Sequence, residues 1–310
     1  MLLQRFQLME SMAEIIDGKK IAADIRAEIK ANVAWLTDSH GLVPGLAVVL
    51  VGNNPASASY VRMKKKACEE LGVASFEYLL PEETSQGELL KLIEELNGKP
   101  EVNGILVQLP LPAQINEESI LRAISPSKDV DGFHPVNVGK LLIGEEDGFL
   151  PCTPYGIQEM LVRVVPNLKG KHVVVVGRSN IVGKPVAALM MQKGVRANCI
   201  VTVCHTAAAD ISVYTKQADI LVSAAGRPHT ITKDMVKPGA VVIDVGTNHV
   251  PNPDDPSKPK LVGDVDFDDV SKIASAISPV PGGVGPMTIT MLLQNTLKAC
   301  CLQHNVKINL

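Results

Sequence analysis

The chain has 310 residues, more than a single hydrophobic core usually holds, so we expect two domains. Hydrophobic residues make up 46% and charged residues 20%, which is typical of globular proteins. The net charge of −3 and the lack of an arginine- or lysine-rich arm argue against a nucleic-acid partner. No apolar run approaches the roughly 18 residues of a membrane helix, so we expect no membrane contact.

The six cysteines form no CxxC pair and no Cys/His cluster with metal spacing. Most of them lie in apolar runs, so we expect buried, reduced thiols and no metal site. The first twelve residues carry one arginine, one glutamate and no cleavage-like run of small residues, which is unlike a secretory or transit peptide. We therefore expect a cytoplasmic protein.

The first half of the chain alternates between strand and helix patterns. Helical periodicity begins at Gly18, at Ser57, after the capping box at 85–88, and after Asn116. Between these helices lie short apolar runs typical of buried strands, at 46–51, 74–80 and 104–109. This order predicts a parallel sheet flanked by helices.

A second alternation begins at Lys171. The predicted helix covers 183–194, and the predicted strands cover 172–176, 199–204, 220–224, 240–245 and 276–278. This layout is typical of a Rossmann-like, doubly wound dinucleotide-binding domain. An amphipathic helix at 287–304 follows, and we expect it to return to the first domain. The fold class is therefore α/β with two domains: residues 13–156 plus 287–310 form the catalytic domain, and 157–286 form the cofactor domain.

Lys64 is the first candidate for chemistry. On a helix from 57 to 71, it falls inside the apolar arc, four residues after Tyr60, whereas Lys65 and Lys66 face water. A lysine drawn inward has a lower pKa and can move protons near neutral pH. The alternative is that the Lys64 side chain snorkels and keeps its ammonium in water.

The run from Val173 to Pro185 reads as a buried strand, a tight turn at Gly177 and a helix that starts at Gly183. Such a turn lets backbone approach a pyrophosphate, although a plain strand-turn-helix remains the alternative. The next strand ends at Cys204 without the acidic residue that NAD enzymes place on the ribose. Because Arg178 lies at the same loop, we expect NADP as the cofactor.

Four other features stand at predicted strand ends or loops. Gln108 ends an apolar strand and points to a ligand crevice, or it caps backbone at the sheet edge. Asp129 and Asp131 alternate, so one of them faces a site, unless both are exposed turn carboxylates. The run Pro281-Gly-Gly-Val-Gly-Pro286 suits a flat ligand or an interdomain hinge. His205 reads as a cofactor-side or structural residue.

Taken together, these stretches resemble the bifunctional methylenetetrahydrofolate dehydrogenase/cyclohydrolase family. The resemblance covers about 15–299. Its motifs, in order, are Tyr60-x-x-x-Lys64, Gly104-Ile-Leu-Val-Gln-Leu-Pro-Leu-Pro112, Lys128-Asp-Val-Asp-Gly132, Pro151-Cys-Thr-Pro154, Gly177-Arg-Ser-x-Ile-Val-Gly-x-Pro185 and Pro281-Gly-Gly-Val-Gly-Pro-Met-Thr288. The resemblance implies a homodimer joined through the cofactor domains and a cleft between the two domains of each subunit. Its substrates would be one-carbon derivatives of tetrahydrofolate.

The resemblance also implies roles for individual residues. Lys64 would be the catalytic lysine, hydrogen-bonded to Gln108 and Tyr60, with Ser57 nearby. The folate would bind at Tyr60, Lys64, Gln108, Leu109, Asp131, Gly282, Gly283 and Thr288. NADP would bind at Gly177, Arg178, Ser179, Ile181, His205, Thr206, Ala225, Gly226 and Thr247. Thr206 differs from the usual serine of the family but keeps its hydroxyl.

The implied chemistry is hydride transfer from methylenetetrahydrofolate to NADP, followed by hydrolysis of the methenyl product to formyltetrahydrofolate. Two other functions stay open at this point. One is a dehydrogenase that lacks cyclohydrolase activity, and the other is a non-catalytic protein that binds NADP or folate. Intact Lys64, Tyr60 and Gln108 favour the bifunctional enzyme.

Overall fold

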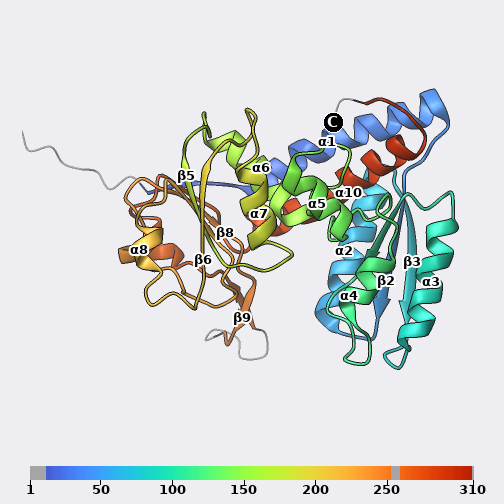
Figure 1. Ribbon diagram of the computed structural model, residues 1–310, viewed down its shortest axis with the longest axis horizontal. Coiled ribbons are helices and arrows are strands. Elements are labelled where there is room, and N and C mark those ends of the chain that lie inside the picture. Colours follow the sequence, from blue (N-terminus) through green and yellow to red (C-terminus); the bar gives the residue numbers. More distant parts are fainter. Residues whose placement is uncertain (1–11, 253–258, 309–310) are drawn as a thin grey trace, which may run out of the picture.

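A computed structural model describes residues 12–252 and 259–308, which form two α/β lobes side by side (Figure 1). The segment 1–11, on which part of the localisation argument rests, lies outside the described residues. Within the described ranges, none of the helices combines the length and apolarity needed to cross a bilayer.

The first lobe is built on a three-stranded parallel sheet in the order β3-β2-β4. Its strands are β2 (Gly45–Val51), β3 (Ala74–Leu80) and β4 (Gly104–Val107), and its helices are α1 (Gly18–His40), α2 (Pro55–Leu71), α3 (Gln86–Gly98) and α4 (Glu117–Ala123). The predicted strand and helix order is confirmed. All seven residues of β2 are buried, as expected for a central strand covered on both faces. β4 ends two residues before the predicted end, so Gln108 is the first residue beyond it.

The helix α5 (Pro135–Ile143) was not predicted. Its sequence signals are a proline at the first position and His134, whose Nδ1 accepts a hydrogen bond from the Val136 N–H at 3.1 Å. Proline suits a first helical turn because no partner for its missing N–H is needed there. The helix has only nine residues, too few for its periodicity to stand out.

The second lobe has a six-stranded sheet in the order β1-β11-β8-β7-β5-β6, with every pair parallel. Its strands are β1 (Glu14–Ile15), β5 (His172–Val176), β6 (Ile200–Cys204), β7 (Ile220–Ser223), β8 (Val241–Asp244) and β11 (Ala276–Ile277). The smaller elements are α7 (Gly183–Met190), α8 (Ser212–Thr215), α9 (Phe267–Val270), a 3-10 helix (Lys233–Met235) and the hairpin of β9 (Asn248–Val250) and β10 (Lys260–Val262). The predicted doubly wound layout is confirmed.

Two differences concern the ends of this lobe. The predicted first domain starts at residue 13, yet β1 pairs with β11, so residues 14–15 belong to the second sheet. A two-residue strand carries no sequence pattern, and only its distant partner reveals it. α7 ends at Met190 rather than at Gly194, because the chain turns before β6 and Gly194 has a positive φ of 145°.

Two helices join the lobes: α6 (Cys152–Val164) and α10 (Val284–Gln303). α10 packs against α1, α2 and α6, and Figure 1 shows it in red beside the blue α1. One buried cluster runs from Leu46 of β2 through Met291 of α10 to Val173 of β5, so the lobes share a core. The last helix therefore returns to the first lobe as predicted. The predicted boundary at 156/157 falls inside α6, and the domain limits stay a prediction.

The start of α1 is pressed against the glycine-rich run before α10. The Lys19 N–H donates to the Gly282 carbonyl at 3.1 Å, and a Cβ at Gly18 would lie 1.9 Å from the Gly283 oxygen. We predict that Gly18→Ala lowers the free energy of unfolding by about 1–3 kcal/mol, because this contact has no room for a methyl group.

Urea denaturation of Gly18→Ala and Gly285→Ala tests this contact. Gly285 lies in the first turn of α10, and a Cβ there would meet nothing within 4 Å. Gly285→Ala should therefore match the wild type or exceed it by up to about 1 kcal/mol. Equal stability of the two variants would contradict the packing described here.

Candidate active site

The helix α2 carries Lys64 with its side chain turned inward. Asn54 caps the helix by accepting hydrogen bonds from the Ala56 and Ser57 N–H groups, and Gly72 ends it with a positive φ of 77°. Lys64 is only 8% exposed, whereas Lys65 and Lys66 are exposed and pair with carboxylates. The inward orientation predicted from the helix period is confirmed.

Gln108 is the hydrogen-bond partner of Lys64. The Lys64 Nζ donates to Gln108 Oε1 at 2.7 Å, and Gln108 Nε2 donates to the Leu109 carbonyl at 2.8 Å. The second bond fixes the orientation of the amide, so its oxygen faces the lysine. Gln108 thus does both things considered from the sequence, since it bonds local backbone and also faces a functional side chain.

The two alternating aspartates point to different places. Asp129 is buried and accepts hydrogen bonds from the backbone N–H groups of Phe133 and His134 and from Asn137 Nδ2, so it holds its own loop. Burial raises the pKa of Asp129 to about 7, although the hydrogen bonds from these donors lower it in part. Asp131 lies close enough to Lys64 for their charges to interact.

Burial lowers the pKa of Lys64 below its usual value, and the negative charge of Asp131 partly opposes this change. Burial likewise raises the pKa of Asp131, and the positive charge of Lys64 opposes it. An ammonium whose pKa is lowered by burial, and which is held by one amide near one carboxylate, is suited to proton transfer.

Tyr60 and Ser57 lie on the same helix as Lys64 but differ in exposure. Ser57 is 5% exposed, whereas Tyr60 is 40% exposed. Among the described residues, no hydrogen bond joins the Tyr60 hydroxyl to Lys64, so that part of the expectation is wrong for this structure. The period of the helix places Tyr60 one turn from Lys64, yet its ring lies at the surface.

The glycine-rich run lies where α1, α6 and α10 begin. Gly282 has a positive φ of 109°, which favours glycine, and Gly283 is buried against Gly18. Thr288, one turn into α10, has its hydroxyl 3.0 Å from the hydroxyl of Thr153 in α6. The run itself therefore packs against the start of α1, and α10 meets α6 one turn beyond it.

The predicted cofactor residues all follow four neighbouring strands of the second sheet. Gly177 follows β5, His205 and Thr206 follow β6, Ala225 and Gly226 follow β7, and Thr247 follows β8. The sheet order β8-β7-β5-β6 makes these strands consecutive, so their carboxyl ends meet at one edge. In open α/β sheets, ligands bind at this edge.

The turn between β5 and α7 has the shape that a dinucleotide needs. Gly177 has a positive φ of 124°, and a Cβ there would lie 2.2 Å from the Ala224 carbonyl oxygen. A Cβ at Gly183 would lie 2.2 Å from the Gly177 oxygen. Only glycine allows so close an approach of the two turns, and the residues present therefore fit a nucleotide.

At this turn, the backbone N–H groups at the start of α7 were expected to face a pyrophosphate, but two of them bond a side chain of the protein instead. Ser179 Oγ accepts hydrogen bonds from the Val182 and Gly183 N–H groups, so the start of α7 already has a cap. Arg178 and Ile181 are exposed, and Arg178 forms no ion pair within the described residues. The guanidinium rather than the helix end is thus the charged group available to a ligand.

His205 and Thr206 continue from β6. His205 Nδ1 accepts a hydrogen bond from the Ala207 N–H at 3.2 Å, which orders the turn, and Thr206 and Thr247 are exposed.

Within the described ranges, no group of three or more His, Cys, Asp or Glu side chains could hold a metal ion. All six cysteines are unpaired.

Sequence reasoning missed three buried polar residues beside these stretches. Asn295 of α10 donates through Nδ2 to the carbonyls of Val130 and Leu150, both at 2.9 Å, and so ties the Asp131 loop to the last helix. Asp244 and Asp264 organise the turns that follow β7 and β8. Asn295 and Asp244 interrupt apolar runs, which was their only signal, whereas Asp264 lies in a polar stretch and had none.

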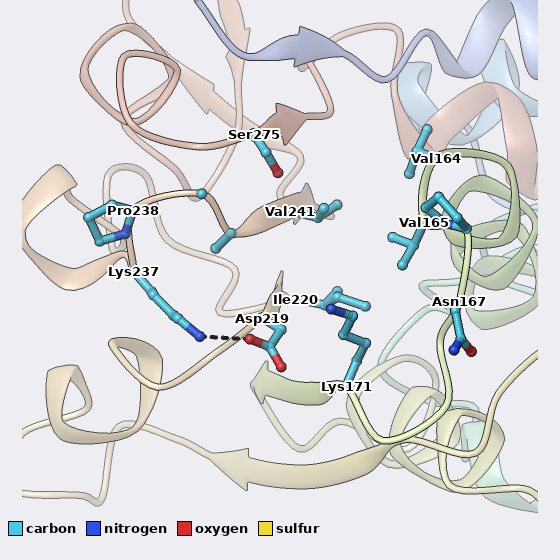
Figure 2. A pocket seen from close by; sticks show the side chains of 13 residues that line it. Val164, Val165, Asn167, Lys171, Asp219, Ile220, Lys237, Pro238, Val241 and Ser275 are labelled. Carbon is cyan, nitrogen blue, oxygen red and sulfur yellow. Dashed lines mark hydrogen bonds and ion pairs between the residues drawn. The ribbon is translucent and has the colours of Figure 1, made fainter. Parts of the chain in front are cut away.

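A separate cavity of about 460 Å³ lies at the opposite, amino-terminal edge of the second sheet (Figure 2). Figure 2 shows Lys237 and Asp219 on one of its walls, joined by an ion pair of 2.7 Å, and Lys171 on another. None of the predicted site residues lines this cavity.

Two family models match the chain. The model "Tetrahydrofolate dehydrogenase/cyclohydrolase, catalytic domain" matches residues 16–131, and "Tetrahydrofolate dehydrogenase/cyclohydrolase, NAD(P)-binding domain" matches residues 151–304. The chain belongs to the tetrahydrofolate dehydrogenase/cyclohydrolase family. The resemblance drawn from six motifs is thereby confirmed, as is the two-domain fold class.

Similar proteins agree with this family over nearly the whole chain. The "Bifunctional protein FolD" of Chlorobium phaeobacteroides is 59% identical over 287 residues, covering 92% of this chain and 97% of that protein. The crystal structure of the bifunctional FolD enzyme of Campylobacter jejuni is 50% identical with a TM-score of 0.88, covering 94% and 99%. The Trypanosoma brucei FolD structure, complexed with NADP cofactor and inhibitor, is 40% identical with a TM-score of 0.90, covering 96% and 100%.

We predict that Asp131→Asn moves the ionisation of Lys64 to lower pH. The Asp131 charge raises the pKa of Lys64 against the effect of burial, so removing that charge lowers the pKa further. The pH profile of methenyltetrahydrofolate hydrolysis should then show its lysine limb at lower pH than in the wild type.

The matched control is Glu77→Gln, which removes a carboxylate that pairs with exposed Lys65 rather than with Lys64. Its profile should keep the wild-type limb. A limb that stays in place in Asp131→Asn, or moves to higher pH, would contradict the proximity of Asp131 and Lys64.

Proposed function

We propose that this protein oxidises methylenetetrahydrofolate to methenyltetrahydrofolate with NADP, and then hydrolyses the methenyl product to formyltetrahydrofolate, in one-carbon metabolism. The observation that carries the proposal is the hydrogen bond from buried Lys64 to Gln108, close to Asp131. A family member without the hydrolytic step would have no use for an ammonium held at this cost in hydration.

For the hydrolytic step, water adds to the methenyl carbon and a proton leaves the adduct. The bond from this carbon to one of the two nitrogens that it bridges then breaks, which leaves a formyl group on the other nitrogen. Lys64 is the group placed to move this proton, because burial brings its pKa closer to neutrality. Gln108 keeps the amine at a fixed position, and Asp131 is the partner proposed for the amino and ring nitrogens of the pterin. Tyr60, Ser57, Leu109, Gly282, Gly283 and Thr288 complete the proposed folate site.

For the oxidative step, bound NADP supplies the hydride acceptor. The residues of the chain hold it against the folate, which is the positioning part of catalysis. We assign this task to the four turns at the carboxyl edge of the second sheet, with Arg178 facing the 2′-phosphate and no acidic residue there to repel it. The folate then lies between the two lobes.

We also infer a homodimer joined through the second lobes. β6 is an edge strand of the six-stranded sheet, and its Ile200 and Val203 side chains are 62% and 40% exposed. An exposed apolar edge strand is a ready template for pairing with another chain.

The cytoplasm is the compartment that we propose, since it keeps buried thiols such as Cys68 reduced.

We predict that Lys64→Met lowers the rate of methenyltetrahydrofolate hydrolysis by at least about 100-fold, because the group proposed to transfer the proton is lost. Binding of NADP, measured by calorimetry, should stay at the wild-type level, since Lys64 belongs to the other lobe.

Lys65→Met is the matched control for this variant. Lys65 is the next residue, lies on the exposed face and pairs with Glu77 at 2.8 Å. It should hydrolyse the methenyl substrate at the wild-type rate. Wild-type hydrolysis by Lys64→Met would overturn the role of the lysine, and an enzyme that oxidises but never hydrolyses would favour the dehydrogenase alone.

We predict that Arg178→Gln weakens NADP binding by on the order of tenfold and leaves NAD binding nearly unchanged. The guanidinium is proposed to meet only the 2′-phosphate. A charge-assisted pair contributes about 1.5–3 kcal/mol, and the lower end, which suits an exposed side chain, corresponds to roughly tenfold in affinity. Dissociation constants of both nucleotides for both proteins measure the difference. Equal losses for NADP and NAD would contradict this assignment, and a wild-type preference for NAD would contradict the choice of cofactor.

A further inference from the structure

Asp264 is fully buried and lies just before α9, outside every motif that identified the family. Its Oδ2 accepts hydrogen bonds from the N–H groups of Ala225 at 2.7 Å and Gly226 at 3.1 Å. Its Oδ1 accepts from the Arg227 N–H at 3.1 Å and from Asn248 Nδ2 at 2.9 Å. One carboxylate thus gathers donors from the turn after β7 and from the first residue of β9.

Three successive backbone N–H groups that converge on one point form an anion-binding nest. In this protein, the Asp264 carboxylate fills the nest formed by residues 225–227, so these amides are not available to a phosphate. The turn has no regular secondary structure of its own, and Gly226 adopts a positive φ of 69°. The bonds to Asp264 therefore set the conformation of this turn.

Asp244, at the end of β8, holds Asp264 in place. Its Oδ1 accepts from the N–H groups of Gly246 and Asp264, both at 2.9 Å, and its Oδ2 accepts from the Val265 N–H at 2.9 Å. A Cβ at Gly263 would lie 1.8 Å from Asp244 Oδ2, so a glycine is required there. The two carboxylates connect the strand ends to both turns.

We propose that Asp264 is a positioning residue for NADP. By holding 225–227 and Asn248, it fixes the turn that carries Ala225 and Gly226 and the start of β9 directly after Thr247, three residues that the resemblance assigns to NADP. The inference rests on the proposed function, because it is the bound dinucleotide that these turns would meet. Asp264 itself is too deeply buried to touch the ligand.

The test compares wild type with Asp264→Asn. Counting the Ser223 hydroxyl, 3.5 Å from Oδ2, Asp264 has five donors. In either orientation, the new amide presents an NH2 group to two or three of them, so about half of the hydrogen bonds are lost. In the protein without ligand, hydrogen–deuterium exchange of the amides at 225–227 should rise on the order of tenfold. The dissociation constant of NADP should rise by a similar factor, on the order of tenfold.

Hydrolysis of methenyltetrahydrofolate is the internal control, since it needs no redox cofactor and takes place at Lys64. It should stay within about twofold of wild type in Asp264→Asn, which a general loss of folding would not allow. Asp266→Asn is the matched variant. Asp266 accepts a 3.5 Å hydrogen bond from the Asp269 N–H at the start of α9 and should leave NADP binding and exchange unchanged.

Wild-type NADP affinity in folded Asp264→Asn would overturn the inference and leave the proposed function intact. Failure of the wild type to bind NADP would instead overturn the proposed function. If Asp264→Asn does not fold, Asn248→Ala tests the inference instead, because it removes one donor to Asp264 and keeps the backbone hydrogen bonds. Its NADP affinity should fall about threefold, and unchanged affinity would contradict the inference.

Discussion

The hydrogen bond between Lys64 Nζ and Gln108 Oε1 is the constraint on which the site depends. It joins the buried face of α2 to the end of β4, and it holds an ammonium that has lost most of its water. Removing a charge from water is unfavourable unless partners replace the lost hydration. A neutral amide and one nearby carboxylate do so only in part, which leaves Lys64 with a lowered pKa. The same imbalance makes the residue useful for proton transfer.

The two lobes carry separate parts of the chemistry on one shared core. The proton-transfer residues lie on the first sheet and α2, and the turns assigned to the nucleotide lie on the second sheet. α6 and α10 join them through a buried cluster that reaches both sheets. A close-packed core of this kind is hard to compress. The glycine-rich run before α10 is likewise packed against Gly18 with no room for a methyl group. We infer that this rigidity positions donor and acceptor for hydride transfer.

Much of the fold was predictable because it depends on the local spacing of apolar residues along the sequence. The helix period alone predicted that Lys64 faces inward and Lys65 outward, and the apolar runs predicted β2 to β8 and β11 to within two residues at each end. What could not be predicted depends on contacts between distant segments. β1 has two residues and no pattern, and it exists only because β11 lies beside it. Asp264 likewise reads as one more polar residue until the fold brings the turn at 225–227 to it.

A titration of the lysine side chains by NMR tests the account most directly. With the lysine Cε carbons labelled, the Lys64 signal is the one that disappears in a variant without this lysine. The account predicts that Lys64 titrates below its usual value of 10.5, and below the neighbouring Lys65, whose pKa is raised by its bond to Glu77. A Lys64 pKa at or above 10.5 would mean that the ammonium keeps its water, and it would contradict the account.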